Sequence, residues 1–165
     1  MIIIALDLGC ETGIAMGNLE ELSMGGVKKW KKSSPVGDSR FVDFYRWLRN
    51  IVANTLSLKQ EITIVAEKTN QHMPGYDGPR IHFGMQAVID IIQAENPGIN
   101  VIRVSALTIK KYWLGSAKLR GKASKIAMVK KTQELYPKVT NDNEADAIAL
   151  YHYTIDNLIN KGELK

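Results

Sequence analysis

Three acidic residues occur where a purely structural role would not require a carboxylate. Asp7 directly follows the apolar run 2–6, and Glu67 directly follows a second apolar run, 62–66. Asp146 lies among alanines and aliphatic residues near the end of the sequence. A carboxylate at the end of a buried strand is costly unless it is paired, hydrogen-bonded or bound to a metal ion. These three acids are therefore candidate catalytic residues.

Carboxylates that converge on one site repel one another, and a divalent cation offsets that repulsion. Hard oxygen donors suit Mg²⁺ or Mn²⁺. In nucleases with paired ions, two cations about 4 Å apart hold the attacking and leaving oxygens of phosphate hydrolysis. Each acid taken singly is also compatible with a turn cap or a surface position. Their joint occurrence indicates a catalytic, metal-binding site much more strongly than any one of them does.

The elements that must position these acids are predicted from the spacing of apolar and turn-forming residues. The run 2–6 is typical of a strand buried on both faces. Strands are expected at 2–6, 13–17, 22–30, 62–66 and 99–104, the first three as an antiparallel meander. Helices are expected at 39–56, 80–95, 105–113, 122–136 and 141–159, with Ser105 capping the third and Asn141 or Asp142 capping the last. This order predicts an α/β fold with a mixed five-stranded sheet flanked by helices.

Length and composition narrow the class of protein. The 165 residues suit a single domain, 1–165, and 45% of them are hydrophobic. Cys10 is the only cysteine, which excludes an internal disulfide and a cysteine-rich zinc site. No positive charge precedes the first apolar run, unlike in a secretory signal, and no apolar run approaches the roughly 18 residues of a membrane helix. We therefore expect a soluble, cytoplasmic protein with no membrane partner.

The net charge of +5 is distributed unevenly along the chain. Between Ser105 and Thr140, nine basic residues accompany a single acid, Glu134, so this block carries +8 and the rest of the chain −3. A concentrated basic block favours a polyanionic partner. The alternative interpretation, to which we give equal weight, is that these residues form a solvated helix face without a partner. The basic residues are Lys110, Lys111, Lys118, Arg120, Lys122, Lys125, Lys130, Lys131 and Lys138.

Several of these segments together resemble the RuvC family of Holliday-junction resolvases, most closely its small phage-encoded members. The similar segments are Ile-Ile-Ile-Ala-Leu-Asp7-Leu-Gly with Thr12-Gly13, Ile-Val-Ala-Glu67, Gly-Ser-Ala…Lys122-Ala-Ser-Lys125, and Asn143-Glu-Ala-Asp146-Ala-Ile-Ala. They occur in the family's order and span nearly the whole chain. The resemblance implies a ribonuclease H-like fold, a homodimer, and two symmetric cuts across a four-way DNA junction. It places the protein in the cytoplasm of a bacterial host if it is phage-encoded.

The resemblance also implies four metal-binding acids. Asp7, Glu67 and Asp146 match directly, but the family's usual Asp three residues before the last acid is Asn143 here. At about 100° per residue, Asp142 lies about 40° around the helix from Asp146, and Asn143 lies about 60° the other way. Asp142 is therefore the preferred fourth ligand, and Asn143, as a neutral oxygen ligand, remains the alternative.

The mechanism that follows from the resemblance is metal-assisted hydrolysis by two Mg²⁺ or Mn²⁺ ions. One ion activates a water for in-line attack on the scissile phosphate, and the other neutralises the leaving 3′ oxygen, so that a 5′ phosphate remains. Lys122 matches a lysine near the family's active site and is a candidate contact to the scissile phosphate, followed by Lys125. We expect further phosphate contacts from Lys110, Lys111, Lys118 and Arg120.

The segment after Glu67 departs from the family. RuvC-type enzymes use an aromatic residue there to wedge the junction open, whereas positions 69 and 70 are not aromatic in this chain. Two alternatives remain open: Tyr76 or His72 takes the place of the family's wedge residue, or this chain has no wedge. A second basic patch, 28–32, is interpreted as a solvated strand end rather than as a contact to a DNA arm.

Three other functions compete with junction cleavage. The Asp7-Leu-Gly and Thr12-Gly13 pattern also resembles the phosphate-binding hairpin of actin-like ATPases, but those enzymes need two lobes and this chain is too short for both. A DNA-binding module without catalysis would not need the three acids. A nuclease of the same fold acting on RNA–DNA hybrids is separated from a resolvase only by comparing substrates.

Overall fold

The computed structural model describes residues 1–31, 39–68 and 77–159. Its centre is a mixed sheet of five strands in the order β3-β2-β1-β4-β5. The strands β1, β2 and β3 form the antiparallel meander, and β4 and β5 continue the sheet parallel to β1. Their bounds are β1 Ile2–Asp7, β2 Glu11–Gly17, β3 Leu22–Lys29, β4 Ile62–Glu67 and β5 Asn100–Val104. The predicted mixed five-stranded sheet is confirmed, with strand ends within two residues of those expected.

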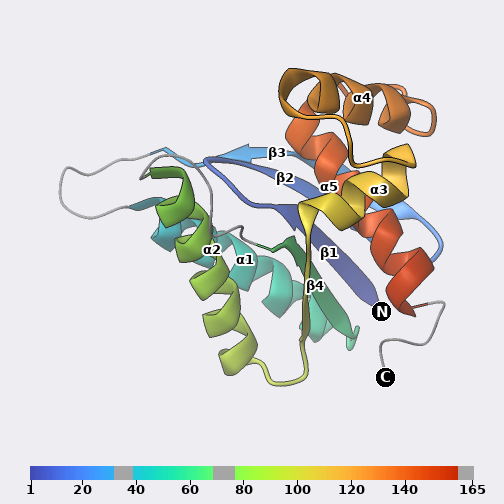
Figure 1. Cartoon of the computed structure of the whole chain (residues 1–165). Helices are drawn as coiled ribbons and strands as arrows, with labels where there is room; N and C mark the ends of the chain where they lie inside the picture. The colour runs from blue at the N-terminus through green and yellow to red at the C-terminus, as the bar shows by residue number, and fades with distance from the viewer. Residues whose placement is uncertain (32–38, 69–76, 160–165) are drawn as a thin grey trace.

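Helices cover both faces of this sheet (Figure 1). On one face α1 (Ser39–Ser57) packs beside α2 (Asp77–Glu95). On the other, α5 (Asp142–Tyr153) crosses the strands directly, and α3 (Ala106–Leu114) and α4 (Gly121–Gln133) pack against α5. A π-helical turn, Thr154–Ile159, continues α5. None of the described helices is both long and apolar enough to span a bilayer.

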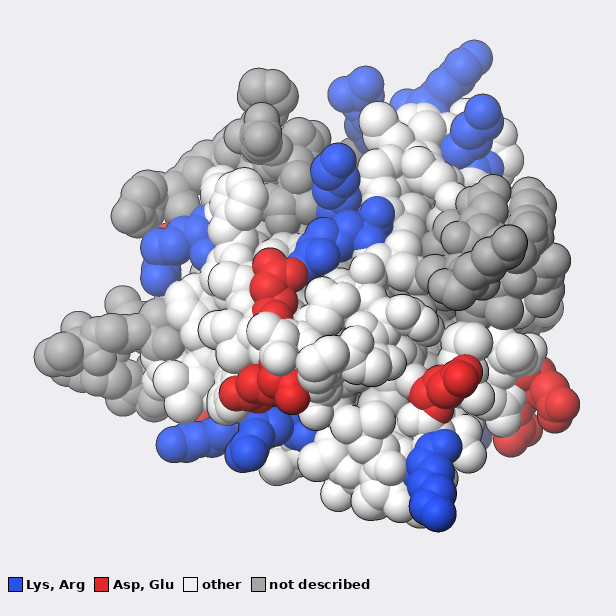
Figure 2. Space-filling view, turned by 90° about the horizontal axis from the view of Figure 1, so that it is seen from below, with Lys and Arg blue, Asp and Glu red and all other residues white. Residues whose placement is uncertain are grey.

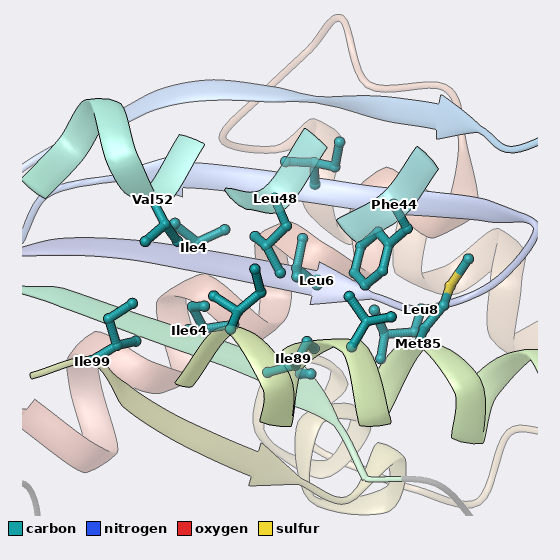
Figure 3. Close-up of a cluster of buried hydrophobic side chains, with 14 of the residues drawn as sticks. Ile4, Leu6, Leu8, Phe44, Leu48, Val52, Ile64, Met85, Ile89 and Ile99 are labelled. Carbon is teal, nitrogen blue, oxygen red and sulfur yellow. The ribbon is translucent and has the colours of Figure 1, made fainter. Parts of the chain in front are cut away.

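The central strand β1 is buried on both faces, as its continuous apolar run predicted. Ile4 and Leu6 point toward α1 and α2, where they join Phe44 and Ile89 in one core (Figure 3). Ile3 and Ala5 point the other way, into a second core beneath α5. Because side chains alternate along a strand, two cores require apolar residues at every position. Asp7 is the first residue of β1 that breaks this rule.

The helix ends differ from the predictions in ways that have local causes. Ser105 caps α3 as expected, with its Oγ accepting a hydrogen bond from the Thr108 N–H at 3.1 Å. Of the two candidate caps for α5, Asn141 takes the role, so the Asp142 side chain is not used as a cap. The helix α2 begins three residues earlier than predicted, at Asp77. The helix α4 ends at Gln133 rather than at 136, and turn hydrogen bonds close the chain before Pro137.

Candidate active site

The sheet carries two of the predicted acids at one edge. Asp7 ends β1 and Glu67 ends β4, and these two strands are parallel neighbours with Leu6 paired to Ala66. Their carboxyl ends therefore reach the same edge of the sheet. The helix α5 packs over β1 and β2 at this edge and brings Asp142 and Asp146 from the far end of the sequence. Residues separated by more than 130 positions thus meet in one place.

A close backbone contact fixes where α5 begins. Gly13 on β2 pairs with Asp7 across the hairpin, and a Cβ at this glycine would lie 1.8 Å from the backbone oxygen of Asn143. The Asn143 side chain also donates from Nδ2 to the backbone oxygen of Glu11 at 3.0 Å. Only a residue without a side chain allows α5 to approach β2 so closely. The Thr12-Gly13 pattern seen in the sequence therefore has a positional role, because it lets α5 deliver its acids beside Asp7.

We expect Gly13→Ala to move the acids of α5 away from the acids at the ends of β1 and β4. The added methyl group would overlap the backbone of Asn143, so the start of α5 must shift, with a stability loss of about 1–3 kcal/mol. A displacement of about 1 Å at a catalytic group costs about 100-fold in rate, and we expect any activity that needs Asp142 and Asp146 beside Asp7 to fall by that factor. Gly98→Ala is the control, because a Cβ there meets nothing within 4 Å. A Gly13→Ala protein as stable and as active as this control would contradict the proposed role of the contact.

The four carboxylates act on one another electrostatically. Burial, followed by the charges of Asp146, Glu67 and Asp142, holds the pKa of Asp7 well above its usual range. Burial and then the charge of Asp146 raise the pKa of Glu67 to about 7. Burial is also the main cause that raises the pKa of Asp146 to about 6. The acids form one cluster in which negative charge is difficult to accommodate, a frequent property of active sites.

Two lysines partly offset this negative charge. The Lys125 ammonium on α4 forms an ion pair with the Asp142 carboxylate. Lys110 on α3 lowers the pKa of both Glu67 and Asp146, and these three residues line a cavity of about 60 Å³. Lys110 was predicted only as a DNA contact. Its place beside the acids could have been anticipated, because α3 follows β5 at the same edge of the sheet as Asp7 and Glu67.

The four carboxylates of the cluster fit a divalent cation both in the type of their donor atoms and in their total charge. Four carboxylates supply hard oxygen ligands, and two ammonium groups leave an excess of two formal negative charges when all the acids are ionised. Within the described ranges no three acidic, histidine or cysteine side chains already stand as a closed set around an ion. Binding of an ion would therefore require rotations about the side-chain torsions of these acids.

The two candidates for the fourth ligand differ in orientation. Asp142 lies close enough to Asp7 and Asp146 to raise the pKa of both. The Asn143 amide is committed through its nitrogen to the backbone of β2. Glu144 lies beside Gly25 on β3, away from Asp7. The structure thus brings Asp142 into the cluster with the three acids that the sequence placed there.

The remaining predicted phosphate contacts lie on α3, on α4 and on the connection between them. Lys111, Lys118, Arg120 and Lys122 are exposed. A groove of about 660 Å³ runs along α4 and reaches the start of α5, lined among others by Lys122, Lys125, Lys130 and Asp142. By contrast, the side of the molecule opposite α4 carries interspersed acidic and basic groups (Figure 2). The groove therefore joins basic side chains to the acidic cluster.

Two other predictions concern the loop after Glu67 and the second basic patch. The candidate wedge residues, His72 and Tyr76, lie outside the described residues. In the basic patch, Lys29 pairs with Glu11 at 2.7 Å, and Lys28 lies 5.4 Å from the ring centre of Trp30. These intramolecular contacts favour the interpretation of the patch as a strand end.

Similarity to solved structures defines the fold class. The structure of Thermus thermophilus RuvC is similar over 98% of this chain and 97% of that chain, with a TM-score of 0.71 and 14% sequence identity. This chain has a ribonuclease H-like fold. The structure of T. thermophilus RuvC in complex with a Holliday junction substrate is similar over 91% of this chain and 90% of that chain, with a TM-score of 0.65 and 12% identity. No protein-family model matches the chain, and no curated protein sequence does.

Proposed function

We propose that this protein is a metal-dependent endonuclease of the RuvC type, which cleaves Holliday junctions and other branched DNA. The observation that carries the proposal is the meeting of Asp7, Glu67, Asp142 and Asp146 at one edge of a ribonuclease H-like sheet, beside a groove lined by lysines. A structural neighbour with this fold is described in complex with a Holliday junction. The burial and mutual repulsion of the acids support a catalytic role, since neither would help a purely structural site.

The four acids are the proposed ligands for two Mg²⁺ or Mn²⁺ ions. Held there, such ions would supply an activated water and would neutralise charge on the leaving 3′ oxygen, so that cleavage would leave a 5′ phosphate. The protein's own contribution is to hold the acids on rigid strand ends and on α5, and to place Lys110 and Lys125 beside them. These two ammonium groups, with Lys122 in the adjoining groove, are suited to receive the scissile phosphate.

A panel of labelled substrates tests the proposal. The protein is incubated with Mg²⁺ or Mn²⁺ and with four-way, three-way, duplex and RNA–DNA hybrid substrates of the same sequence. We expect cutting of the branched substrates that depends on the cation and leaves 5′ phosphates. Preferential cutting of the hybrid would favour a ribonuclease H activity instead. Tight ATP binding without DNA binding would favour the actin-like alternative.

We expect junction binding to weaken steeply with salt. Each phosphate neutralised by a basic side chain contributes about −0.9 to the slope of log K against log salt concentration. The double variant Lys118→Gln/Arg120→Gln, on the exposed α3–α4 connection, should reduce this slope by about 2. Arg49→Gln on α1 is the matched control and should leave the slope unchanged. A junction complex insensitive to salt would contradict the proposed surface.

The proposed function requires two active sites, because a resolvase makes two symmetric cuts, and we propose a homodimer. The apolar groove between α1 and α2, of about 310 Å³, is the candidate contact, with Val42 and Ile91 half-exposed beside Phe41, Tyr45 and Val88. Ile91→Glu should place a charge in this contact and yield a folded monomer by size-exclusion chromatography, with coupled cutting of the junction lost. A variant that stays dimeric would place the interface elsewhere.

A further inference from the structure

A buried glutamine on α2 holds the backbone of the proposed catalytic acid Glu67. The Gln86 side chain is 8% exposed and donates from Nε2 to the backbone oxygen of Glu67 at 2.6 Å. Glu67 is the last residue of β4, opposite Val104 at the end of β5. One residue further on, the Lys68 N–H donates to the backbone oxygen of Val104 at 2.7 Å. Gln86 therefore holds the chain at the point where the sheet ladder ends and the acid projects.

Arg103 on β5 sets the orientation of the Gln86 amide. Its Nε donates to Gln86 Oε1 at 2.5 Å, and its Nη2 forms an ion pair with Asp90. Because a guanidinium group has donors and no acceptor, it can only face the oxygen of the amide. The amide nitrogen is thereby directed toward Glu67. Gln86 and Asp90 lie four residues apart on one face of α2, so a single helix supplies both partners of Arg103.

The chain Asp90–Arg103–Gln86–Glu67 ends at the acid's own peptide group, which a packing role would not require. The same helix buries Met85 and Ile89 in the apolar core and needs no polar group for that purpose. A buried amide costs free energy unless both of its ends are hydrogen-bonded, and here both are. Fixing the peptide after Glu67 restricts its backbone torsion and so restricts where the carboxylate can point.

We propose that Gln86 is a positioning residue, which holds Glu67 toward Asp146 and Asp7 through this hydrogen-bonded chain. The inference rests on the proposed function, since it assigns a purpose to the placement of Glu67 as a metal ligand. Groups that orient metal ligands from behind typically change metal affinity by about 10- to 100-fold when they are removed.

The test compares Gln86→Met with Gln93→Met. Methionine keeps the length of glutamine but provides no N–H donor. Gln93 is the matched control, because it also lies on α2 and also donates to a backbone oxygen, that of Ile99 at 3.3 Å, but about two helical turns further along, near the end of α2. Gln86→Glu is the second variant, since it keeps the pair with Arg103 and loses the donor to Glu67.

We expect both Gln86 variants to raise the Mn²⁺ dissociation constant, measured by paramagnetic resonance of free Mn²⁺, by about 10-fold or more. The kcat on a four-way junction should fall, while the junction dissociation constant in Ca²⁺ should stay within about twofold of wild type, because DNA contacts lie elsewhere. Gln93→Met should leave all three values unchanged. Arg103→Met should move Mn²⁺ affinity in the same direction, and the Gln86→Met/Arg103→Met double variant should be no weaker than Gln86→Met.

The inference is overturned if Gln86→Met and Gln93→Met bind Mn²⁺ equally well while the wild type binds Mn²⁺ and cuts junctions. That outcome would leave the proposed function standing. A wild-type protein that neither binds Mn²⁺ nor cuts any of the substrates would overturn the proposed function and the role of Gln86 together.

Discussion

The Asp7→Asn protein is expected to bind four-way junctions as tightly as the wild type. We expect it to cut them at no more than about one thousandth of the wild-type rate. Asp7 is the member of the cluster whose charge interacts with all three other acids, so its loss affects every proposed ligand position. A 1,000-fold loss corresponds to about 4 kcal/mol of transition-state stabilisation. Asparagine has nearly the same shape, so the fold and the basic groove should remain intact.

Single-turnover cleavage of an end-labelled junction in Mg²⁺ measures the rate, and a mobility shift in Ca²⁺ measures binding. Asp43→Asn on the exposed side of α1 makes the same chemical change outside the cluster and should cut like the wild type. If Asp7→Asn cut at the rate of Asp43→Asn, Asp7 would not be a catalytic residue.

The second large effect concerns stability, and its sign follows from the pKa of Glu67. In the folded protein this pKa is raised from 4.5 to about 7, so the folded state keeps a proton that the unfolded chain releases. Stability of the metal-free protein therefore falls as the pH rises from about 4.5 to 7 and stays reduced above pH 7. Glu67→Gln removes this penalty. At pH 8 in a chelator we expect the variant to be more stable by about 1–3 kcal/mol, which raises Tm by several degrees.

Urea or thermal unfolding at two pH values measures this effect. At pH 4, below both pKa values, the carboxyl group is mostly protonated in both states, so the variant and the wild type should have nearly equal stability. Addition of Mg²⁺ at pH 8 should stabilise the wild type more than the variant, because the proposed site would bind the ion in the folded state through this carboxylate. A Glu67→Gln protein that is less stable than wild type in the chelator at pH 8 would contradict the predicted repulsion.

Much of the fold could be predicted because its signals are local. The run 2–6 identified β1 as a strand with two buried faces, and the polar residue after each of two apolar strands marked Asp7 and Glu67. The spacing of Asp142 and Asp146 on one helix face is equally local. The meeting of Asp7 and Glu67 depends in addition on β1 and β4 being parallel neighbours, which the two apolar runs do not specify.

The rest of the site depends on how helices pack, which no local pattern specifies. Lys125 meets Asp142 only because α4 lies against α5. The choice of Asn141 over Asp142 as the helix cap was open in the sequence, since both residue types cap helices well. Gln86 was not identified from the sequence, because its role arises from three elements that converge behind Glu67.

The close seating of α5 on Gly13 also has a consequence for biosynthesis. Asp7 and Glu67 are synthesised before Asp142 and Asp146, so the cluster is incomplete until α5 has been made. A nascent or proteolytically shortened chain that ends before residue 142 has β1 and β4 but half of the acids. If the four acids act together as proposed, such a fragment should have none of the activity that depends on them.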